Sequence, residues 1–148
     1  MERLVPAGAI YFSMDEQDVR RILGFEHTMI GSDGLPHDAA PHPRLWGTFP
    51  RVLGHYARDA SLFSLETAVH KMTGLTAKTF GLADRGVLKS GYAADITLFD
   101  AGTVDAAATF EKSMQPARGI AAVLVNGTPV WRDGQSTGER PGKVLRRG

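Results

Sequence analysis

The sequence predicts an α+β chain in which strands and helices alternate first and a small antiparallel sheet follows. Apolar residues recur at helical spacing through most of the first half, whereas β-prone runs dominate from Gly86 onward. The pair Asn126-Gly127 separates two of these runs and is the strongest short signal for a β-hairpin. We therefore expect two portions, residues 1–83 and residues 84–148.

The start of the chain has the order strand, helix, strand. Residues 10–13 form a short β-prone run, and residues 27–31 form a second one. Between them, residues 15–23 carry acidic side chains first and basic side chains last, which suits the dipole of a short amphipathic helix. This order is typical of a crossover in a parallel sheet.

Two further helices are expected before the boundary. Residues 48–58 place apolar side chains three and four positions apart, with Thr48 as a plausible N-cap. Ser64 is the expected N-cap of the next helix, which ends at Gly74, and residues 75–80 predict a further helical turn or two.

The sequence of the second portion, residues 84–148, predicts β-strands. Residues 94–100, 120–126 and 128–132 are β-branched or aromatic runs bounded by Gly, Asp or Asn. They predict a small antiparallel sheet or part of a sandwich.

Composition excludes several classes of protein. The 148 residues are 43% hydrophobic, carry a net charge of +1 and include no Cys. The near-neutral charge gives no general attraction to nucleic acid or to an anionic membrane, and the lack of Cys removes disulfides and thiolate ligands. No apolar stretch approaches the roughly 20 residues that span a bilayer. We expect a soluble, cytoplasmic protein that binds neither nucleic acid nor membrane.

Asp33 is the first candidate for chemistry. It follows Met29-Ile30-Gly31-Ser32, at the end of the β-prone run of residues 27–31, and precedes Gly34. Taken locally, Asp-Gly is typical of a simple turn. A carboxylate where an apolar strand meets a loop is also where a barrel enzyme places a catalytic group.

Longer motifs carry a resemblance to a known family. They are Ala-Ile-Tyr-Phe (9–12), Ser-Asp-Gly-Leu-Pro-His (32–37), the run from Gly86 to Asp100 and the run from Val123 to Gly134. Together they resemble the end of the N-acyl-D-amino-acid deacylases (D-aminoacylases) of the amidohydrolase superfamily. This resemblance implies the last strand-helix units of a (β/α)8 metal-dependent hydrolase barrel, followed by a lobe of a composite β-sandwich. A whole barrel needs about 250 residues, so the chain corresponds to a C-terminal part.

The resemblance also implies roles for two residues. Asp33 matches the aspartate that acts as general base and acid in amide hydrolysis. Arg44, in His42-Pro43-Arg44, matches the arginine that holds the α-carboxylate of the substrate, a group that a guanidinium fork binds well. The alternative for Arg44 is a surface arginine that packs over Trp46 or donates a hydrogen bond to a backbone carbonyl.

A metal site is expected only in a complete enzyme. The family's usual metal is zinc, and a catalytic zinc needs about three protein ligands. His37 and His42 have a suggestive spacing, but the resemblance assigns neither to the metal. Asp33 is a possible ligand only together with upstream ligands that this chain lacks. A serine nucleophile is not supported, because Ser32 lacks the Gly-x-Ser-x-Gly pattern.

The resemblance thus implies hydrolysis of N-acyl-D-amino acids to a carboxylate and a D-amino acid. We expect the isolated chain to be inactive and to self-associate or to bind an upstream barrel segment. The alternative is a non-catalytic binding or assembly module from a truncated deacylase gene.

Overall fold

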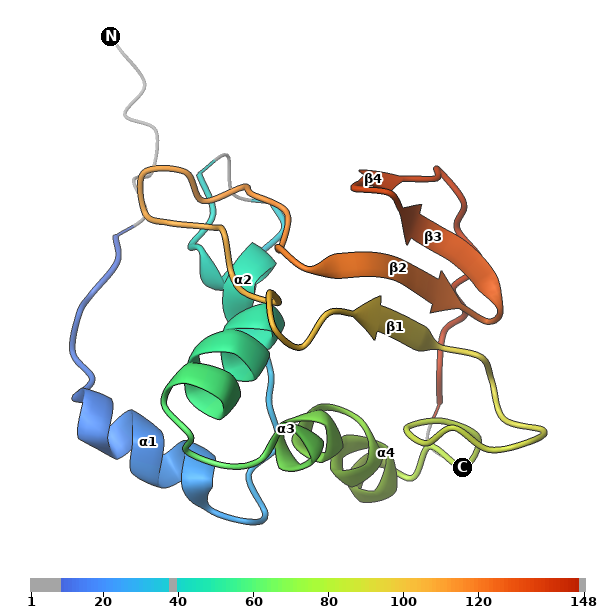
Figure 1. Cartoon of the computed structure of the whole chain (residues 1–148), viewed down its shortest axis with the longest axis horizontal. Coiled ribbons are helices and arrows are strands. Elements are labelled where there is room, and N and C mark those ends of the chain that lie inside the picture. Colours follow the sequence, from blue (N-terminus) through green and yellow to red (C-terminus); the bar gives the residue numbers. More distant parts are fainter. Residues whose placement is uncertain (1–8, 38–39, 147–148) are drawn as a thin grey trace, which may run out of the picture.

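The computed structural model describes residues 9–37 and 40–146. Helices gather in one half of the molecule, and the strands form the other half (Figure 1). The helical half contains α1 (Glu16–Gly24), α2 (Arg44–Arg51), the π-helix η1 (Val52–Asp59), α3 (Leu65–Met72) and α4 (Gly74–Phe80). The sheet contains β1 (Ile96–Phe99), β2 (Ile120–Val125), β3 (Thr128–Arg132) and β4 (Gln135–Ser136). Within the described ranges, no helix has the length and apolar character needed to cross a membrane.

Two helices begin where their capping residues predict. The Asp15 carboxylate accepts a hydrogen bond of 2.7 Å from the Gln17 N–H at the start of α1. The Ser64 hydroxyl oxygen accepts one of 3.2 Å from the Thr67 N–H at the start of α3. Both bonds satisfy N–H groups that the first helical turn leaves without partners. The helix expected over residues 15–23 and the start at Ser64 are therefore confirmed.

Helix α2 begins earlier than the sequence predicts. It starts at Arg44, so the start at Thr48 was wrong, and the Thr48 hydroxyl instead donates to the Arg44 carbonyl within the helix at 2.8 Å. Pro50 lies inside α2, and because its nitrogen has no hydrogen it cannot donate to the α-helical ladder. The helical path continues after Pro50 with π-helical bonding as η1.

The two expected strands of the first portion are absent from the described structure. Residues 10–13 and 27–31 are not assigned to any strand. The Ile30 N–H reaches only the Lys71 carbonyl, at 3.4 Å, rather than a neighbouring strand. A strand is defined by its paired neighbour, and no neighbour for these runs lies in residues 9–37 or 40–146.

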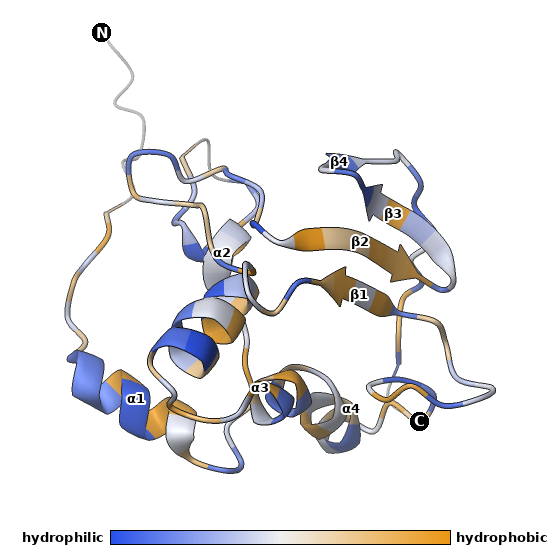
Figure 2. Ribbon diagram, viewed as in Figure 1, coloured by the Kyte–Doolittle hydropathy of each residue, from blue (hydrophilic) through white to orange (hydrophobic). Residues whose placement is uncertain are grey.

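The antiparallel sheet is confirmed, with strand order β1-β2-β3-β4. Asn126 and Gly127 both have positive φ, 48° and 80°, as the tight hairpin between β2 and β3 requires. Asp133 and Gly134, with φ of 53° and 80°, form the corresponding turn between β3 and β4. The apolar residues of β1 and β2 stand out in Figure 2.

The buried core joins the two halves. It contains Val52, Leu53, Tyr56 and Ala57 of η1, Ala68 of α3, and Val104 from the loop after β1. Val104 is fully buried, and the Arg58 guanidinium donates to its carbonyl at 2.7 Å. The division into residues 1–83 and 84–148 stays a prediction, since side chains from both portions share this core.

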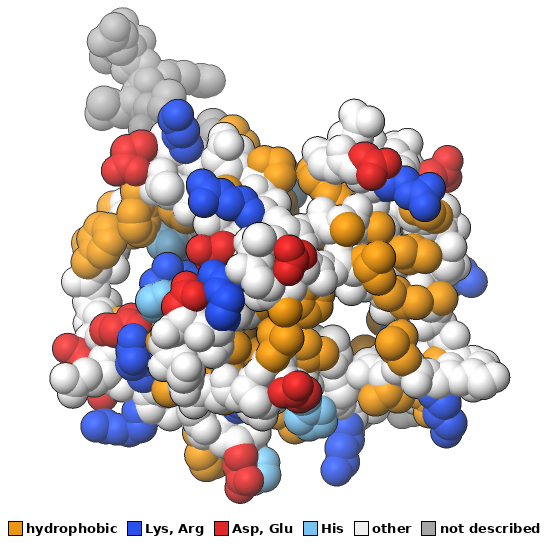
Figure 3. All heavy atoms as spheres, viewed as in Figure 1, with side chains coloured by type: hydrophobic (Ala, Val, Ile, Leu, Met, Phe, Trp, Pro, Cys, Tyr) orange, Lys and Arg blue, Asp and Glu red, His pale blue; other side chains and the backbone are white. Residues whose placement is uncertain are grey.

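Apolar side chains are also exposed beside the sheet. Figure 3 shows hydrophobic atoms gathered between the helical half and the strands. Leu98 on β1 is 58% exposed, and Leu88 in the preceding loop is 82% exposed. Because β1 is an edge strand, its free backbone groups and these side chains form a surface suited to association.

Lys71 of α3 is the one buried charged side chain among the described residues, with 1% of its surface exposed. Its ammonium group donates to the carbonyls of Phe25 and Thr28, in the turn that leads from α1 toward Asp33. Burial lowers the pKa of Lys71 below its ordinary value. The side chain therefore fastens this turn to α3.

Replacing Lys71 with Met is expected to destabilise the chain. The apolar stem is retained, but the Phe25 and Thr28 carbonyls lose their donor, which reduces the free energy of unfolding by about 1–3 kcal/mol. Denaturant unfolding measures the change. Lys78→Met is the matched control, because Lys78 is exposed on α4. Equal stability of the two variants would contradict a fastening role.

Candidate functional site

The structure brings Asp33 and Arg44 together. The Oδ2 atom of Asp33 lies 2.9 Å from the Nη2 atom of Arg44, although eleven residues separate them along the chain. The Asp33 side chain is 81% exposed and the Arg44 side chain 39% exposed. The pair combines a carboxylate open to solvent, which can take a proton, with a guanidinium that can bind an anion.

The loop that carries Asp33 is held by close backbone packing. Asp33 has a φ of 48°, and the Gly34 N–H donates to the Ser32 hydroxyl oxygen at 3.3 Å. A Cβ atom at Gly34 would lie 2.9 Å from the Cα of Leu45 and closer still to its side chain. The lack of a side chain at Gly34 therefore allows this loop to lie directly against the residue after Arg44.

Gly34→Ala is expected to separate Asp33 from Arg44. The added methyl group would meet the Leu45 backbone, so the loop must move away, at a cost of about 1–3 kcal/mol in the free energy of unfolding. Gly31→Ala is the matched control, since a Cβ there has no neighbour within 4 Å. Unfolding curves give the stability, and NMR of the Arg44 side chain reports the ion pair. An unchanged Arg44 signal in Gly34→Ala would contradict the prediction.

His42 fixes the backbone of Arg44. Its Nδ1 atom accepts a hydrogen bond of 3.0 Å from the Arg44 N–H, which caps the start of α2. The ring of His42 packs edge-on against Phe110, with 5.3 Å between centroids, and Phe110 packs against Phe12 at 5.1 Å. The loop after β1 thus reaches over to the start of α2 (Figure 1).

Acid is expected to weaken this cap. Burial, and then the charge of Arg44, lower the pKa of His42 from its ordinary value of 6.5. As pH falls below 6.5, the unfolded chain binds a proton at His42 that the folded chain resists, so stability is lost until the folded pKa is passed. His42→Asn keeps a capping oxygen without this titration. Thermal unfolding from pH 7 to pH 5, at about 0.5-unit steps, should show a smaller loss for His42→Asn than for the parent chain.

A steeper or equal loss of stability in His42→Asn would contradict this assignment. The comparison is made as a difference between the two proteins, so that every contribution the two chains share cancels.

The described residues do not by themselves suit a metal ion. Within residues 9–37 and 40–146, no three His, Asp or Glu side chains form a group that could hold one. His42 uses its Nδ1 atom to cap α2, and His37 is exposed. Asp38, between these histidines, lies outside the described residues.

Sequence reasoning singled out Asp33 and Arg44 but missed the residues that hold them. The cap at His42 has a recognisable signal, because Pro43 follows it and proline is favoured in the first turn of a helix. The contact of Gly34 with Leu45 has no comparable signal, since Asp-Gly also occurs in ordinary turns.

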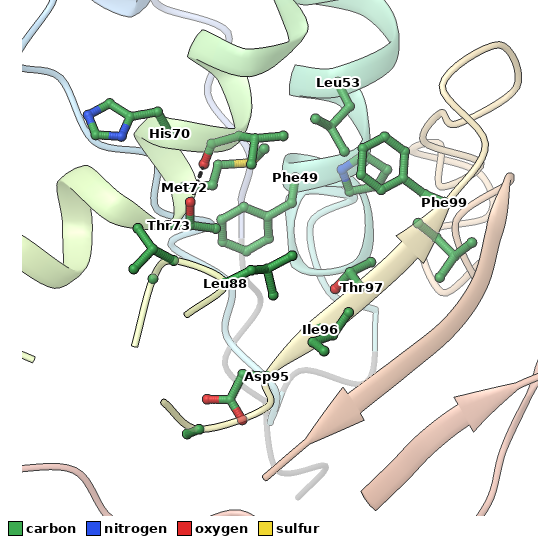
Figure 4. A pocket seen from close by; sticks show the side chains of 16 residues that line it. Phe49, Leu53, His70, Met72, Thr73, Leu88, Asp95, Ile96, Thr97 and Phe99 are labelled. Carbon is green, nitrogen blue, oxygen red and sulfur yellow. Dashed lines mark hydrogen bonds between the residues drawn. The ribbon is translucent and has the colours of Figure 1, made fainter. Parts of the chain in front are cut away.

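A separate cavity of about 630 Å³ lies between the helices and β1. Its walls are largely apolar, with Phe49, Leu53 and Phe99 among them (Figure 4). Of its polar groups, Asp95 is paired with Arg85, and the Thr73 hydroxyl donates to the Val69 carbonyl at 2.7 Å. Neither Asp33 nor Arg44 lines this cavity, so we do not assign the chemistry of the site to it.

Known proteins resemble the chain over most of its length. It is 67% identical over 144 residues to the D-aminoacylase of Alcaligenes xylosoxydans xylosoxydans, an alignment that covers 97% of this chain and 30% of that protein. A D-aminoacylase structure from a study of its binuclear metal centre matches with a TM-score of 0.91 and 64% identity, over 93% of this chain and 29% of the other.

A third relative is the N-acyl-D-glutamate deacylase of Bordetella bronchiseptica, solved with zinc and a phosphonate inhibitor. It matches with a TM-score of 0.90 and 56% identity, over 97% of this chain and 30% of that one. The chain thus spans about 30% of the length of the relatives it matches. The resemblance to N-acyl-D-amino-acid deacylases that the motifs predict is confirmed.

The family profile agrees with these pairwise matches. Residues 17–131 match the amidohydrolase family. This range includes Asp33, Arg44 and the antiparallel sheet as far as β3. The chain therefore belongs to the amidohydrolase family.

Proposed function

We propose that the chain is the C-terminal part of a metal-dependent N-acyl-D-amino-acid deacylase. Residues 1–83 would supply the last strand-helix units of its barrel, and residues 84–148 a lobe of its β-sandwich. The observation that carries the proposal is the approach of the Asp33 carboxylate to the Arg44 guanidinium, at 2.9 Å. Identity of 67% to a D-aminoacylase supports the same reaction class.

The two side chains have complementary tasks in this proposal. Arg44 binds the α-carboxylate of an N-acyl-D-amino acid and so fixes the amide bond relative to Asp33. Asp33 accepts a proton from the attacking water and then delivers it to the amide nitrogen as the C–N bond breaks. The products are a carboxylate and a D-amino acid, and Asp33 returns to its ionised form.

The metal of such an enzyme requires ligands beyond the described residues of this chain. We assign zinc to the complete enzyme, with Asp33 as a ligand only in company with residues from another segment. A catalytic zinc site takes about three protein ligands, and no group of three is found in residues 9–37 and 40–146. The isolated chain is therefore proposed to be inactive.

The proposed partner is the remaining barrel segment of a deacylase. The edge strand β1 and the exposed Leu88 and Leu98 support association, because they leave apolar surface and backbone groups without cover in the described structure. Alternatively, a second copy of this chain would bind the same surface.

The test combines the chain with the part of the Alcaligenes D-aminoacylase that the alignment leaves unmatched. We call this mixture the reassembled enzyme. With zinc added, it is expected to hydrolyse N-acetyl-D-alanine, whereas the chain alone is not. Turnover by the chain alone would overturn the need for a partner. A stable, zinc-loaded complex without turnover would overturn the deacylase assignment.

A non-catalytic binding or assembly module is the second candidate. The lack of a three-ligand metal group in the described residues favours it. It predicts that the chain binds the barrel segment without restoring either zinc uptake or hydrolysis, so the same experiment separates the two functions.

A further inference from the structure

The turn between β2 and β3 contains a pair of residues that can react with each other. Asn126 and Gly127 occupy the two turn positions, with φ of 48° and 80°. Gly127 has no side chain to shield its backbone nitrogen, so this nitrogen can reach the side-chain amide carbon of the preceding asparagine once the chain is free to rotate. The turn therefore contains both a nucleophile and the group that it can attack.

The folded hairpin holds these two groups in other contacts. The Gly127 N–H donates to the Ala94 carbonyl at 2.9 Å. The Nδ2 atom of Asn126 donates to the Pro141 carbonyl at 2.8 Å, and its Oδ1 atom accepts from Nη2 of Arg85 at 3.4 Å. The amide must turn away from these partners, and the nitrogen must lose its hydrogen, before the two can bond. The closed hairpin therefore protects Asn126.

The same amide group ties the C-terminal segment to the sheet. This segment runs back from β4 past the β2–β3 hairpin (Figure 1). Of the hydrogen bonds between described residues, the one from Asn126 to the Pro141 carbonyl is the only one that residues 140–146 make. The position of these residues therefore depends on an intact amide at Asn126.

We propose that Asn126 is a deamidation site that the hairpin protects, and that its conversion releases residues 140–146 from the sheet. When the hairpin opens, the Gly127 nitrogen bonds to Cγ of Asn126, the Cγ–Nδ2 bond breaks, and ammonia leaves with the proton that Gly127 gives up. Water then opens the resulting cyclic imide to an aspartate or an isoaspartate. The reaction consumes one water, releases one ammonia and requires neither metal nor substrate.

Either product lacks the donor that holds the Pro141 carbonyl. A carboxylate at position 126 can only accept hydrogen bonds, so it repels this carbonyl oxygen. It also adds a negative charge beside Asp95, whose Oδ1 atom accepts the Asn126 backbone N–H at 2.7 Å. An isoaspartate lengthens the backbone as well, which no longer suits a two-residue turn.

Mass spectrometry of the full chain, folded and in denaturing urea, measures the reaction, and peptide mapping locates it. Asp133→Asn is the matched variant, because it makes a second Asn-Gly pair in the β3–β4 turn, where φ is 53° and 80° and the side chain is exposed. In the folded variant, Asn126 should react about tenfold or more slowly than the new pair, which corresponds to about 1.4 kcal/mol or more in opening free energy. In urea the two pairs should react at similar rates.

Equal rates at the two pairs in the folded variant would overturn the protection by the hairpin. A lack of reaction at Asn126 in urea would overturn the site itself.

NMR of the Gly142 amide tests the release, because its nitrogen is bonded to the Pro141 carbonyl carbon. Asn126→Asp reproduces one product, and Asn126→Gly removes the donor while keeping a residue that tolerates positive φ. Both variants should shift the Gly142 signal, whereas Asp133→Asn should leave it in place. Because Asn126→Gly preserves the turn, it keeps the test valid if Asn126→Asp fails to fold. An unchanged Gly142 signal in Asn126→Gly would overturn the release.

Discussion

Replacing Asp33 with Asn is expected to lower the kcat of the reassembled enzyme about 10²- to 10⁴-fold, the usual contribution of a general acid-base group. The amide has nearly the shape of the carboxylate but cannot accept the proton of the attacking water. The KM for N-acetyl-D-alanine should change little, because Arg44 still binds the carboxylate of the substrate. Steady-state hydrolysis of N-acetyl-D-alanine measures both constants.

The control for this prediction must show whether an effect on kcat comes from the loss of a negative charge in general or from its loss at position 33. Asp133→Asn removes one negative charge at a turn with a similar φ, 53° against 48° for Asp33. It lies in the turn between β3 and β4 and is exposed, so it should leave kcat within about twofold of the parent value, as surface substitutions usually do. Comparable losses in the two variants would show that Asp33 has no special role in proton transfer.

Local signals in the sequence predicted the local features of the fold. The Asn126-Gly127 turn depends on two residues that tolerate positive φ, and the start of α3 depends on the Ser64 hydroxyl three positions before its partner N–H. In both features, the residues that determine the structure lie within a few positions of one another along the chain. For this reason the hairpin and the helix start were found where the sequence placed them.

Features that depend on distant neighbours were not predicted. The apolar runs at residues 10–13 and 27–31 have strand composition, yet no neighbouring strand in the described structure pairs with them. Lys71 is a charged helix residue that the sequence gives no reason to bury, and its burial follows from carbonyls more than 40 residues away. Tertiary contacts outweigh local preference at these positions.

The candidate site was predictable from the sequence only in part. The chemistry of a carboxylate and a guanidinium can be read from residue types and from the resemblance to the deacylases. The contact between the two side chains cannot be read from the sequence, because it depends on the packing of Gly34 against Leu45 and on the cap that His42 provides. The roles of the two residues therefore stay a prediction, and the fold explains how the two side chains reach each other.

Arg44→Lys is expected to reduce kcat/KM of the reassembled enzyme about tenfold, and Arg44→Gln about 100-fold or more. Lysine keeps the positive charge but loses the planar fork, whereas glutamine loses both. A hydrogen bond to a charged group contributes about 1.5–3 kcal/mol, and each 1.4 kcal/mol corresponds to a factor of ten. The loss should lie mainly in KM, because the carboxylate of the substrate is bound before and during the reaction.

Arg51→Lys is the matched control, because Arg51 ends the same helix and its guanidinium lies over the Tyr56 ring at 5.5 Å. It tests whether any arginine on α2 affects the kinetics through helix stability alone. The neutral substrate N-acetyl-D-alaninamide completes the comparison: its slow hydrolysis should not change in Arg44→Gln, since it has no carboxylate to anchor. If Arg44→Gln slowed the amide and the acid equally, Arg44 would be acting on the fold of the Asp33 loop rather than on the substrate.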